Sequence, residues 1–349
     1  MGETPRTARP AGALVVRPVG WGIVGFGWVA QDFALPAIMA AGHRLVAVHD
    51  TGPVATDAVQ RTGATWHDTL DALLADPAVD AVYVATPNWA HGPVVDAAAA
   101  AGKPVLCEKP MAATLEQAEA MAASVARAGV LYGTAFDQRH HPAHHAIRDA
   151  IQAGRIGRVT AIRITYACWL PPDWSPTGAG DNWRIDQARA GGGALMDLAP
   201  HGLDLTDFLL DEPILSVTAM TQRRVHDYPV DDGAVVVGST ASGILVSLSV
   251  AYNHPDTLPR RRLEIVGTGG MIVAENTMGQ DAGGRVTCLD ARTGSCTDLV
   301  ISDLDVSPFT RQMAAFSDAV RGSAHTFDAA RDLHTMRLLH RCYESAACH

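Results

Sequence analysis

Three residues of the chain combine proton-transfer chemistry with a placement that could bring them together: Lys109, Asp197 and His201. The chain has 27 lysine and arginine residues, and only Lys103 and Lys109 are lysines. A desolvated lysine ammonium can give up a proton near neutral pH, whereas an arginine guanidinium stays charged. Lys109 is therefore a candidate for chemistry, although a solvated surface charge at a strand end is the alternative interpretation.

The other two candidates lie in the run GGGALMDLAPHGLD, residues 191–204. Asp197, His201 and Asp204 have the spacing i, i+4 and i+7, which places them on one face of a helix. We expect the Asp197 carboxylate to hold the His201 imidazole, so that the ring faces a crevice and exchanges a proton near neutral pH. A packed or capping histidine is the alternative.

Pro200 limits where this helix can begin. Proline is tolerated in the first turn of a helix, where the backbone N–H groups have no partners, but it breaks a hydrogen bond further in. We therefore expect the helix to begin near Met196, and Gly191 to Gly193 to form a loop that closes over the site.

The first half of the chain alternates apolar runs with helical stretches. Residues 19–24, 44–50, 80–86, 103–109 and 130–136 read as strands. Alanine-rich segments with helical spacing lie between them, among them residues 91–101 and 114–128. Continuous apolar strands separated by helices are typical of a parallel sheet covered on both faces. The pattern predicts a doubly wound Rossmann-type domain.

A glycine motif follows the first of these strands. GIVGFGWVA places Gly25, Gly27 and Ala30 in the G-x-G-x-x-A spacing, and Asp50 ends the second strand 20 residues after Ala30. Such a turn lets the backbone approach a pyrophosphate, and the carboxylate can bind a ribose 2'-hydroxyl while repelling a 2'-phosphate. No arginine follows in TGPVAT, so NAD is expected and NADP is less favoured.

Two further segments end strands of the same sheet: ATPNWAH (85–91) and CEKP (107–110). Ligands of open parallel sheets bind outside the carboxyl ends of the strands. Lys109 should therefore lie on the rim of the cofactor crevice.

Together these motifs resemble a known family. GFGWVA, TPNWAH, GKPVLCEKPMA, GRIGRV, NWR and GGGALMDLAPHGLD occur in that order. They resemble the glucose-fructose oxidoreductase, inositol dehydrogenase and rhizopine-catabolism (Gfo/Idh/MocA) family of NAD(P)-dependent oxidoreductases. The resemblance runs from about residue 19 and fades in the last hundred residues.

The resemblance implies a set of site residues. The catalytic group would be Lys109, Asp197 and His201. Cofactor contacts are expected from Gly25, Phe26, Gly27, Trp28, Val29, Asp50, Thr86, Pro87, Asn88, His91, Glu108, Lys109, Trp183 and Arg184. Substrate contacts are expected from Lys109, Arg139, His141, Trp183, Asp197 and His201.

The second half of the chain changes to longer alternating segments. Residues 158–169, 214–225, 233–253, 260–277 and 284–301 read as hairpin-connected, largely antiparallel strands, and helices are expected near 309–321 and 328–346. We expect a C-terminal α+β domain with a large, mainly antiparallel, open-faced sheet. The domain boundaries would be a leader at 1–18, a dinucleotide-binding domain at 19–136, and a substrate-binding and oligomerisation domain at 137–349. The resemblance implies that the open face is a subunit interface of a homodimer or homotetramer.

A histidine cluster and a tryptophan-rich loop are the remaining candidates. His140, His141, His144 and His145 include pairs four apart, which can bind zinc on a helix. No carboxylate or cysteine pattern completes a metal shell, so no metal is expected, and contact with substrate or cofactor through Arg139 or His141 is preferred. Residues 167–183 read as a loop that caps the substrate, with tryptophans that could equally be packing residues.

Composition argues against several classes of protein. The formal net charge is -10 and no block of basic residues stands out, which argues against nucleic-acid binding. No run approaches the length of a membrane helix, and the N-terminus lacks the apolar core of a signal peptide. Six dispersed cysteines fit reduced thiols, so a cytoplasmic protein is expected.

The sequence thus predicts an enzyme that reversibly oxidises a secondary alcohol of a sugar, cyclitol or related polyol. His201 would take the hydroxyl proton, Asp197 would orient His201, and Lys109 would stabilise the alkoxide or relay its proton. Two alternatives use the same scaffold: an NAD-dependent glycosidase that oxidises its sugar transiently, and a non-enzymatic dinucleotide-sensing regulator. The intact Lys109, Asp197 and His201 weigh against the regulator.

Overall fold

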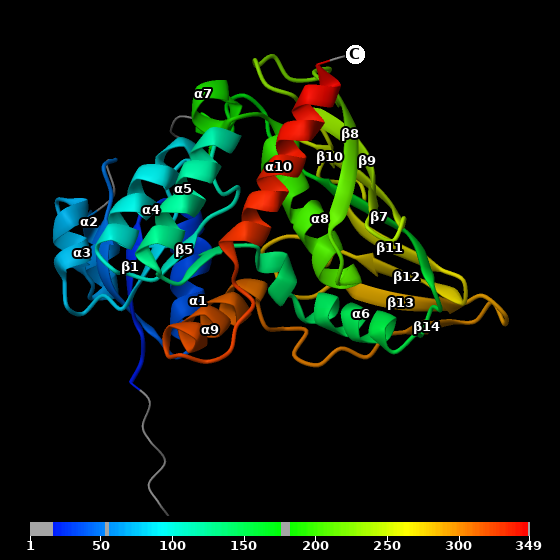
Figure 1. The fold of residues 1–349 in the computed structure, drawn as a ribbon, viewed down its shortest axis with the longest axis horizontal. Helices are drawn as coiled ribbons and strands as arrows, with labels where there is room; N and C mark the ends of the chain where they lie inside the picture. The colour runs from blue at the N-terminus through cyan, green and yellow to red at the C-terminus, as the bar shows by residue number, and fades with distance from the viewer. Residues whose placement is uncertain (1–16, 53–55, 176–181, 348–349) are drawn as a thin grey trace, which may run out of the picture.

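The computed structural model describes residues 17–52, 56–175 and 182–347. Two sheets stand apart in it, each with its own helices, and the C-terminal helices run between them (Figure 1). Residues 1–16 of the expected leader, and residues 176–181 of the expected capping loop, lie outside the described residues.

The first sheet has six parallel strands in the order β3-β2-β1-β4-β5-β6, the strand order of a doubly wound dinucleotide-binding fold. Its strands are β1 (Gly20–Val24), β2 (Arg44–His49), β3 (Thr65–Trp66), β4 (Ala81–Val84), β5 (Val105–Cys107) and β6 (Tyr132–Thr134). The two-residue strand β3 was not predicted, because it is too short to show periodicity.

Helices cover both faces of this sheet. They are α1 (Leu35–Ala40), which continues the π-helical turn η1 (Ala30–Ala34), α2 (Thr56–Thr62), α3 (Leu70–Ala75), α4 (His91–Ala100), which follows the short turn η2 (Asn88–Ala90), and α5 (Leu115–Ala128). Alternate residues of each strand belong to different cores. On β1, for example, Ile23 packs with Ile38 of α1, whereas Val24 shares a core with Val95 of α4. Because both faces of each strand are buried in this way, the apolar runs in the sequence of this sheet are continuous and do not alternate with polar residues.

The second sheet has eight strands in the order β14-β13-β12-β11-β7-β10-β9-β8. Its strands are β7 (Val159–Ala167), β8 (Ile214–Gln222), β9 (Gly233–Thr240), β10 (Leu245–Ala251), β11 (Arg261–Gly267), β12 (Gly270–Glu275), β13 (Arg285–Asp290) and β14 (Cys296–Asp298). All neighbouring pairs are antiparallel except β10 and β7, which are parallel. The predicted fold class is confirmed.

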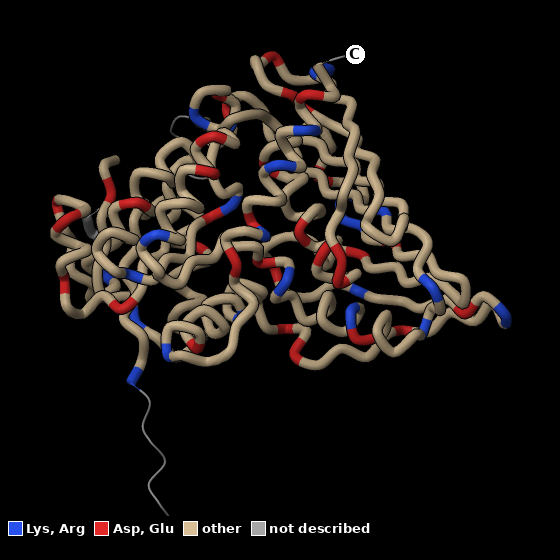
Figure 2. The backbone as a smooth tube through the Cα atoms, viewed as in Figure 1, with Lys and Arg blue, Asp and Glu red and all other residues tan. Residues whose placement is uncertain are grey.

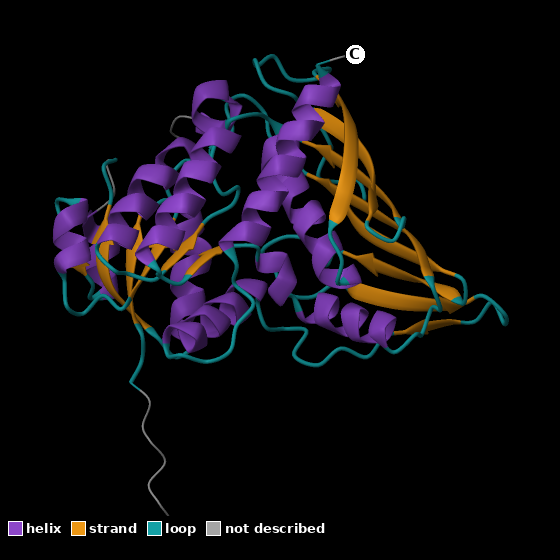
Figure 3. Cartoon of the chain, in the orientation of Figure 1, coloured by secondary structure: helices purple, strands orange, loops and turns teal. Residues whose placement is uncertain are grey.

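Helices cover only one face of the second sheet (Figure 3). The long helix α8 (Ala194–Leu210) packs on β7 and β10, and α10 (Ala329–Ala346) packs on β8. The other helices of this part are η3 (Asp137–His140), α6 (Pro142–Gln152), η4 (Trp183–Ile185) and α7 (Gln187–Ala190).

The helix α9 (Pro308–Val320) returns to the first sheet. Its Phe309, Met313 and Phe316 join the core that contains Trp21 and Ile38. The C-terminal part of the chain therefore completes the second cover of the first sheet, while the expected boundary at 136/137 stays a prediction.

Acidic and basic residues are interspersed along the described backbone (Figure 2). None of the described helices is long and apolar enough to cross a membrane.

Candidate active site

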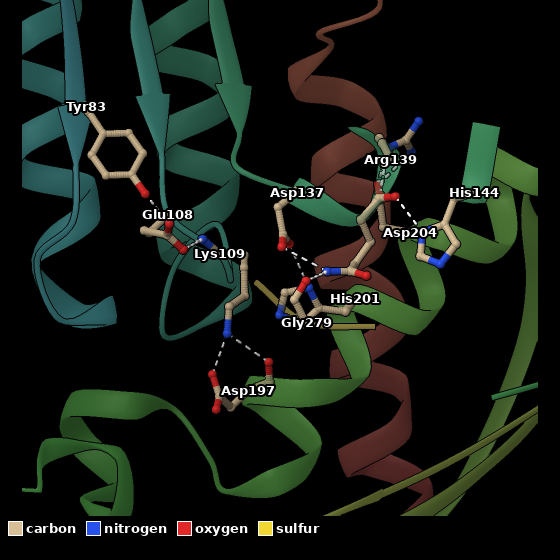
Figure 4. Close-up of polar contacts among 11 residues, drawn as sticks. Tyr83, Glu108, Lys109, Asp137, Arg139, His144, Asp197, His201, Asp204 and Gly279 are labelled. Carbon is tan, nitrogen blue, oxygen red and sulfur yellow. Dashed lines mark hydrogen bonds and ion pairs between the residues drawn. The ribbon is translucent and has the colours of Figure 1, made fainter. Parts of the chain in front are cut away.

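Lys109 lies at the carboxyl end of the parallel sheet, as its position after β5 predicted. The Lys109–Pro110 peptide bond is cis. The ammonium Nζ donates to the Asp197 carboxylate at 2.5 Å and to the Asp197 backbone carbonyl at 3.0 Å. Asp197 lies on α8, so this ion pair joins the two halves of the molecule (Figure 4).

Both oxygens of the Asp197 carboxylate accept hydrogen bonds. Lys109 donates to Oδ1, and the buried Tyr252 hydroxyl donates to Oδ2 at 2.8 Å. Burial alone would raise the pKa of Asp197, but the charges of Lys109 and Arg184 and these two hydrogen bonds outweigh it. The pKa of Asp197 is therefore well below its ordinary value, and the carboxylate keeps the Lys109 ammonium in place.

His201 has a different carboxylate partner from the one expected. Its Nδ1 lies 3.3 Å from Asp137 Oδ1, and both side chains are buried. The ring also packs edge-on against Tyr166, with ring centroids 5.4 Å apart. The expectation that Asp197 holds His201 does not match this geometry, because both Asp197 oxygens face other donors and Asp137 comes from the segment that follows β6.

Helix α8 begins two residues earlier than predicted, and Pro200 lies inside it. The physical reason is a remote cap: the Asp231 carboxylate accepts hydrogen bonds from the backbone N–H groups of Gly193 (3.0 Å) and Leu195 (2.7 Å). This cap stabilises the helix start at Ala194, and it comes from the segment before β9, which no local pattern around Pro200 reveals.

The glycine run 191–193 is packed against three other segments. A Cβ at Gly191 would meet the Ala113 carbonyl, one at Gly192 the Tyr343 hydroxyl, and one at Gly193 the Asp231 carbonyl, each at 2.0 Å or less. The expectation of a loop that closes over the site is therefore wrong. These glycines allow close packing of the α8 start against the cofactor half and α10.

Arg139 and His141 were expected to contact substrate, but both are engaged elsewhere. Arg139 forms a two-pronged ion pair with Asp204, with Nε 2.7 Å from both carboxylate oxygens and Nη2 2.6 Å from Oδ1. His141 is fully buried and accepts the Ala143 N–H as the cap of α6. Asp204 thus holds Arg139 and not His201.

The neighbouring histidines also serve the fold. His144 Nδ1 lies 2.7 Å from the Gln138 carbonyl and Nε2 lies 3.1 Å from Thr277 Oγ1. Burial lowers the pKa of His144 to about 3 and that of His140 to about 3, so both rings are neutral. Among the described residues, no group of three histidine, cysteine or acidic side chains could hold a metal ion.

The glycine motif has the geometry that a bound dinucleotide needs. Gly25 has φ +86°, and a Cβ there would meet the backbone of Ala85 and Thr86 at 2.7–2.8 Å. A Cβ at Gly27 would meet nothing within 4 Å, so the backbone is open to a ligand there. The residues present therefore fit a dinucleotide at the start of the helix that follows β1.

Asp50 braces this turn. One carboxylate oxygen accepts the Phe26 N–H at 2.6 Å and the other accepts the Gly52 N–H at 2.7 Å. Each carboxylate oxygen has a second lone pair, so Asp50 can still accept from a ribose hydroxyl.

Two cofactor candidates at the end of β4 stabilise the crevice wall. Asn88 Nδ2 donates to the Ala190 carbonyl at 2.8 Å. His91 is fully buried, with one ring nitrogen 3.0 Å from the Pro110 carbonyl and the other 2.9 Å from the Thr86 carbonyl. His91 therefore fixes the two strand-end loops against each other, and Asn88 fixes the first of them to the end of α7. Pro87 caps the short turn η2 between them.

Glu108 and Thr86 complete this edge of the sheet. Tyr83 donates a short hydrogen bond to the Glu108 carboxylate. Burial raises the pKa of Glu108 to about 7, against the opposing effects of Tyr83 and Lys109. The buried Thr86 hydroxyl has no hydrogen-bond partner among the described residues, which leaves it available to a ligand.

Aromatic side chains from both halves meet beside the glycine motif. The Trp28 ring contacts Trp174 edge-on, with centroids 5.8 Å apart. The Arg184 guanidinium lies 5.0 Å from the Trp174 ring centre and 4.6 Å from that of Trp183. Within its described part, the 167–183 loop therefore reaches over the cofactor half through Trp174. Val29 follows Trp28 and packs on the core that contains Trp21.

Comparisons with known proteins agree with this arrangement. Residues 19–136 match the model described as "Oxidoreductase family, NAD-binding Rossmann fold", and residues 144–273 match the model of the GFO/IDH/MocA C-terminal domain. The chain is 34% identical over 305 residues to 1,5-anhydro-D-fructose reductase of Ensifer adhaerens, covering 86% of this chain and 88% of that protein. The chain belongs to the Gfo/Idh/MocA family. It is accordingly an oxidoreductase with an NAD(P)-binding Rossmann domain.

Two other members of the Gfo/Idh/MocA family are similar to this chain, one in sequence and one in structure. Inositol 2-dehydrogenase of Rhizobium meliloti (strain 1021) is 31% identical over 266 residues, which cover 74% of this chain and 76% of that one. The crystal structure of aldose-aldose oxidoreductase from Caulobacter crescentus complexed with glycerol superimposes with a TM-score of 0.84 at 25% identity. That match covers 95% of this chain and 98% of the other.

Four site residues were missed from the sequence of this Gfo/Idh/MocA member: Asp137, Gln138, Asp231 and Tyr252. Asp137 and Gln138 follow β6, so the rule that ligand-binding residues follow parallel strands could have found them. Asp231 and Tyr252 lie in the alternating second half, where no local signal marks them.

Proposed function

We propose that the protein reversibly oxidises a secondary alcohol of a sugar, cyclitol or related polyol, with NAD as the hydride acceptor. The observation that carries the proposal is the convergence of Lys109 from the cofactor half with Asp197 and His201 of α8 at the carboxyl edge of the parallel sheet. The similarity to a sugar reductase and an inositol dehydrogenase supports the substrate class.

The chain's own residues have separate tasks in this reaction. His201 accepts the proton of the reacting hydroxyl. Lys109 stabilises the alkoxide that develops on that oxygen, and Asp197 keeps the ammonium in place. When bound, the nicotinamide supplies the site to which hydride transfers.

Asp50 supports NAD over NADP. Its carboxylate ends β2 beside the glycine motif and would repel a 2'-phosphate. We expect kcat/KM with NAD to exceed that with NADP at least tenfold on the best substrate. An equal or reversed ratio contradicts the proposed preference.

The test of the reaction is a panel of polyols, inositols and aldoses, assayed with NAD and NADP by the absorbance of the reduced cofactor. On the best substrate, His201→Ala should lose about 10² to 10⁴ in turnover, the usual worth of a general base, and should still bind NADH. The exposed His340 provides the control, since His340→Ala should keep full activity. Unchanged turnover in His201→Ala would exclude it as the base.

The lysine is tested with the chain's only other lysine as control. Lys109→Arg keeps the charge but cannot donate a proton or fit the compact ammonium site, so we expect a strong loss of turnover. Lys103, whose ammonium donates to the backbone carbonyls of Asp76 and Val79, gives the matched variant Lys103→Arg with activity retained. Glycoside cleavage without net NADH formation would instead assign the glycosidase reaction.

We also propose that a second copy of the chain covers the open face of the second sheet, giving a homodimer or homotetramer. Met220, Val235, Val237 and Leu245 are large apolar side chains on this face and are at least half exposed. Such a patch marks an interaction surface. Sedimentation velocity tests the proposal, and a monomer at micromolar concentration would contradict it.

The compartment proposed is the cytoplasm. The described cysteines, Cys107, Cys168, Cys288, Cys296 and Cys342, are all free. Cys296 pairs in register with Leu289 and not with Cys288, so these two thiols do not face each other across the hairpin. Free thiols fit a reducing environment.

A further inference from the structure

Two buried polar atoms face each other at the centre of the site. His201 Nδ1 and Asp137 Oδ1 are 3.3 Å apart, and the side chains are 7% and 3% exposed. Within the described part of the chain, neither atom has a partner in hydrogen-bond geometry, the other included. Since leaving a buried polar atom unpaired is unfavourable, and no other group among the described residues forms an ion pair or hydrogen bond with either atom, each is the natural partner of the other.

The Asp137 carboxylate is itself fixed. Its Oδ2 accepts from Gln138 Nε2 at 2.8 Å, and the same amide nitrogen donates to the Gly279 carbonyl at 2.9 Å. Because both neighbours of this nitrogen are acceptors, the orientation of the Gln138 amide is determined by its contacts. Figure 4 shows Asp137 beside His201.

The other carboxylates near His201 are already engaged. Asp197 accepts from Lys109 and Tyr252, and Asp204 accepts from Arg139. Asp137 is therefore the carboxylate that the fold presents to the histidine, although it lies 64 residues earlier in the chain than His201.

We propose that Asp137 is the positioning residue of His201: it accepts the Nδ1–H, and so leaves Nε2 as the unprotonated nitrogen that takes the substrate's proton. The inference rests on the proposed function and deepens it. A carboxylate on one ring nitrogen fixes the tautomer and orientation of an imidazole and stabilises the cation that forms when the other nitrogen is protonated. Gln138 in turn fixes the Asp137 carboxylate by donating a hydrogen bond to it.

The variant Asp137→Asn tests the tautomer directly. Gln138 Nε2 can donate only to an acceptor, so the asparagine oxygen should remain on Gln138 and its NH₂ group should face His201. That group would donate to Nδ1 and move the ring proton to Nε2. We expect turnover to fall about 10²-fold or more, with NADH affinity changed less than twofold.

The deciding measurement is the ¹⁵N spectrum of histidine-labelled protein at alkaline pH, because the two ring-nitrogen shifts of a neutral imidazole report which nitrogen carries the proton. The His201 signals are assigned by their loss in His201→Gln. We expect the Nδ1–H tautomer in the unmodified protein and the Nε2–H tautomer in Asp137→Asn. An Nε2–H tautomer in the unmodified protein overturns the proposal, and this readout does not depend on whether Asp137→Asn folds.

A second histidine–aspartate pair provides the control. His67 Nε2 lies 3.0 Å from Asp76 Oδ2 in the cofactor half. Asp76→Asn should leave both turnover and the His201 spectrum unchanged. Full turnover in Asp137→Asn would also overturn the inference. If the unmodified protein oxidises none of the polyols, the proposed function fails while the tautomer result still tests Asp137.

Discussion

The two sheets of this protein differ in how many of their faces are covered by helices. The six-stranded parallel sheet has helices on both faces, so consecutive strand residues such as Val105 and Leu106 are both fully buried in different cores. The eight-stranded sheet has helices on one face, so Val236 is fully buried while Val237 beside it is 52% exposed.

The difference explains where the chemistry lies. A sheet covered on both faces has no accessible surface except at the ends of its strands, and Glu108 and Lys109 follow β5 at such an end. The second sheet supplies its site residues through α8 on the covered face, and its other face is free to bind another chain. The proposed catalytic edge and the proposed association surface are therefore separate.

The sharpest test of the comparison is a pair of substitutions at neighbouring residues of β9. Val236→Asp places a carboxylate without a partner in the core, which should cost about 4 kcal/mol or more of unfolding free energy. Val237→Asp should change the stability of the single chain by no more than about 0.5 kcal/mol. Denaturant unfolding compares the two.

Sedimentation velocity on the same variants separates folding from association. Val237→Asp should shift the protein toward the monomer. Val300→Asp, at a residue that is 91% exposed and outside the second sheet, should leave the oligomer intact. If Val236→Asp and Val237→Asp lowered the free energy of unfolding equally, both faces of the second sheet would be covered within the single chain.

In the first sheet, truncation should be costly at both positions of a neighbouring pair. Leu106→Ala should lose about 2–5 kcal/mol, and Val105→Ala about 2 kcal/mol from the methyl groups removed. The pair Val236→Ala and Val237→Ala should instead differ, with only the first destabilising. A stable Val105→Ala variant would indicate that one face of the parallel sheet is not tightly packed.

The last test of the comparison concerns the pH dependence of stability. Burial raises the pKa of Glu108 to about 7 from an ordinary value of 4.5. The folded state therefore binds the proton more tightly than the unfolded state, and the stabilisation is fully present below pH 4.5 and lost as the pH rises to 7. The loss should approach about 3 kcal/mol.

Glu108→Gln should make this slope smaller in denaturant unfolding measured between pH 4.5 and 7.5, while Asp207, whose pKa burial also raises to about 7, keeps its own part of the slope. Glu264, on the open face, provides the matched control. Hydrogen bonds from Arg262 and Arg163 lower its pKa despite partial burial, so its contribution is lost only as the pH falls below this window. Glu264→Gln should therefore leave the slope unchanged. A slope that is unchanged in Glu108→Gln would show that Glu108 does not contribute to it.

The sequence could predict most of the first sheet, because its signals are local. The glycine spacing, the continuous apolar runs and the position of Lys109 after a strand each depend on neighbours within about 20 residues. The strands of the second sheet were also predicted, but the pairing of β7 with the later strands β10 and β11 joins residues 84 to 108 positions apart. Local periodicity contains no information on such pairing.

The hydrogen-bond partners of the catalytic candidates could not be predicted from sequence patterns within one segment. Helical spacing placed Asp197 and His201 on one face, and from this we expected a hydrogen bond between them. In the structure, Lys109 and Tyr252 donate hydrogen bonds to the Asp197 carboxylate, while the Asp137 carboxylate lies beside the His201 ring. Spacing on one helix shows which side chains share a face, but not which groups from other segments compete for them.

The sequence by itself determined the cofactor-binding architecture, because short-range sterics and hydrophobic periodicity specify strands, turns and glycine positions. The resemblance of its motifs to the Gfo/Idh/MocA family implied the three candidate residues. Only the tertiary structure decided that α8 begins at Ala194 under the Asp231 cap, that Arg139 is paired with Asp204, and that Asp137 faces His201. Each of these depends on a buried polar group finding its partner across a long separation in sequence, where the need for a hydrogen bond in the protein interior selects the contact.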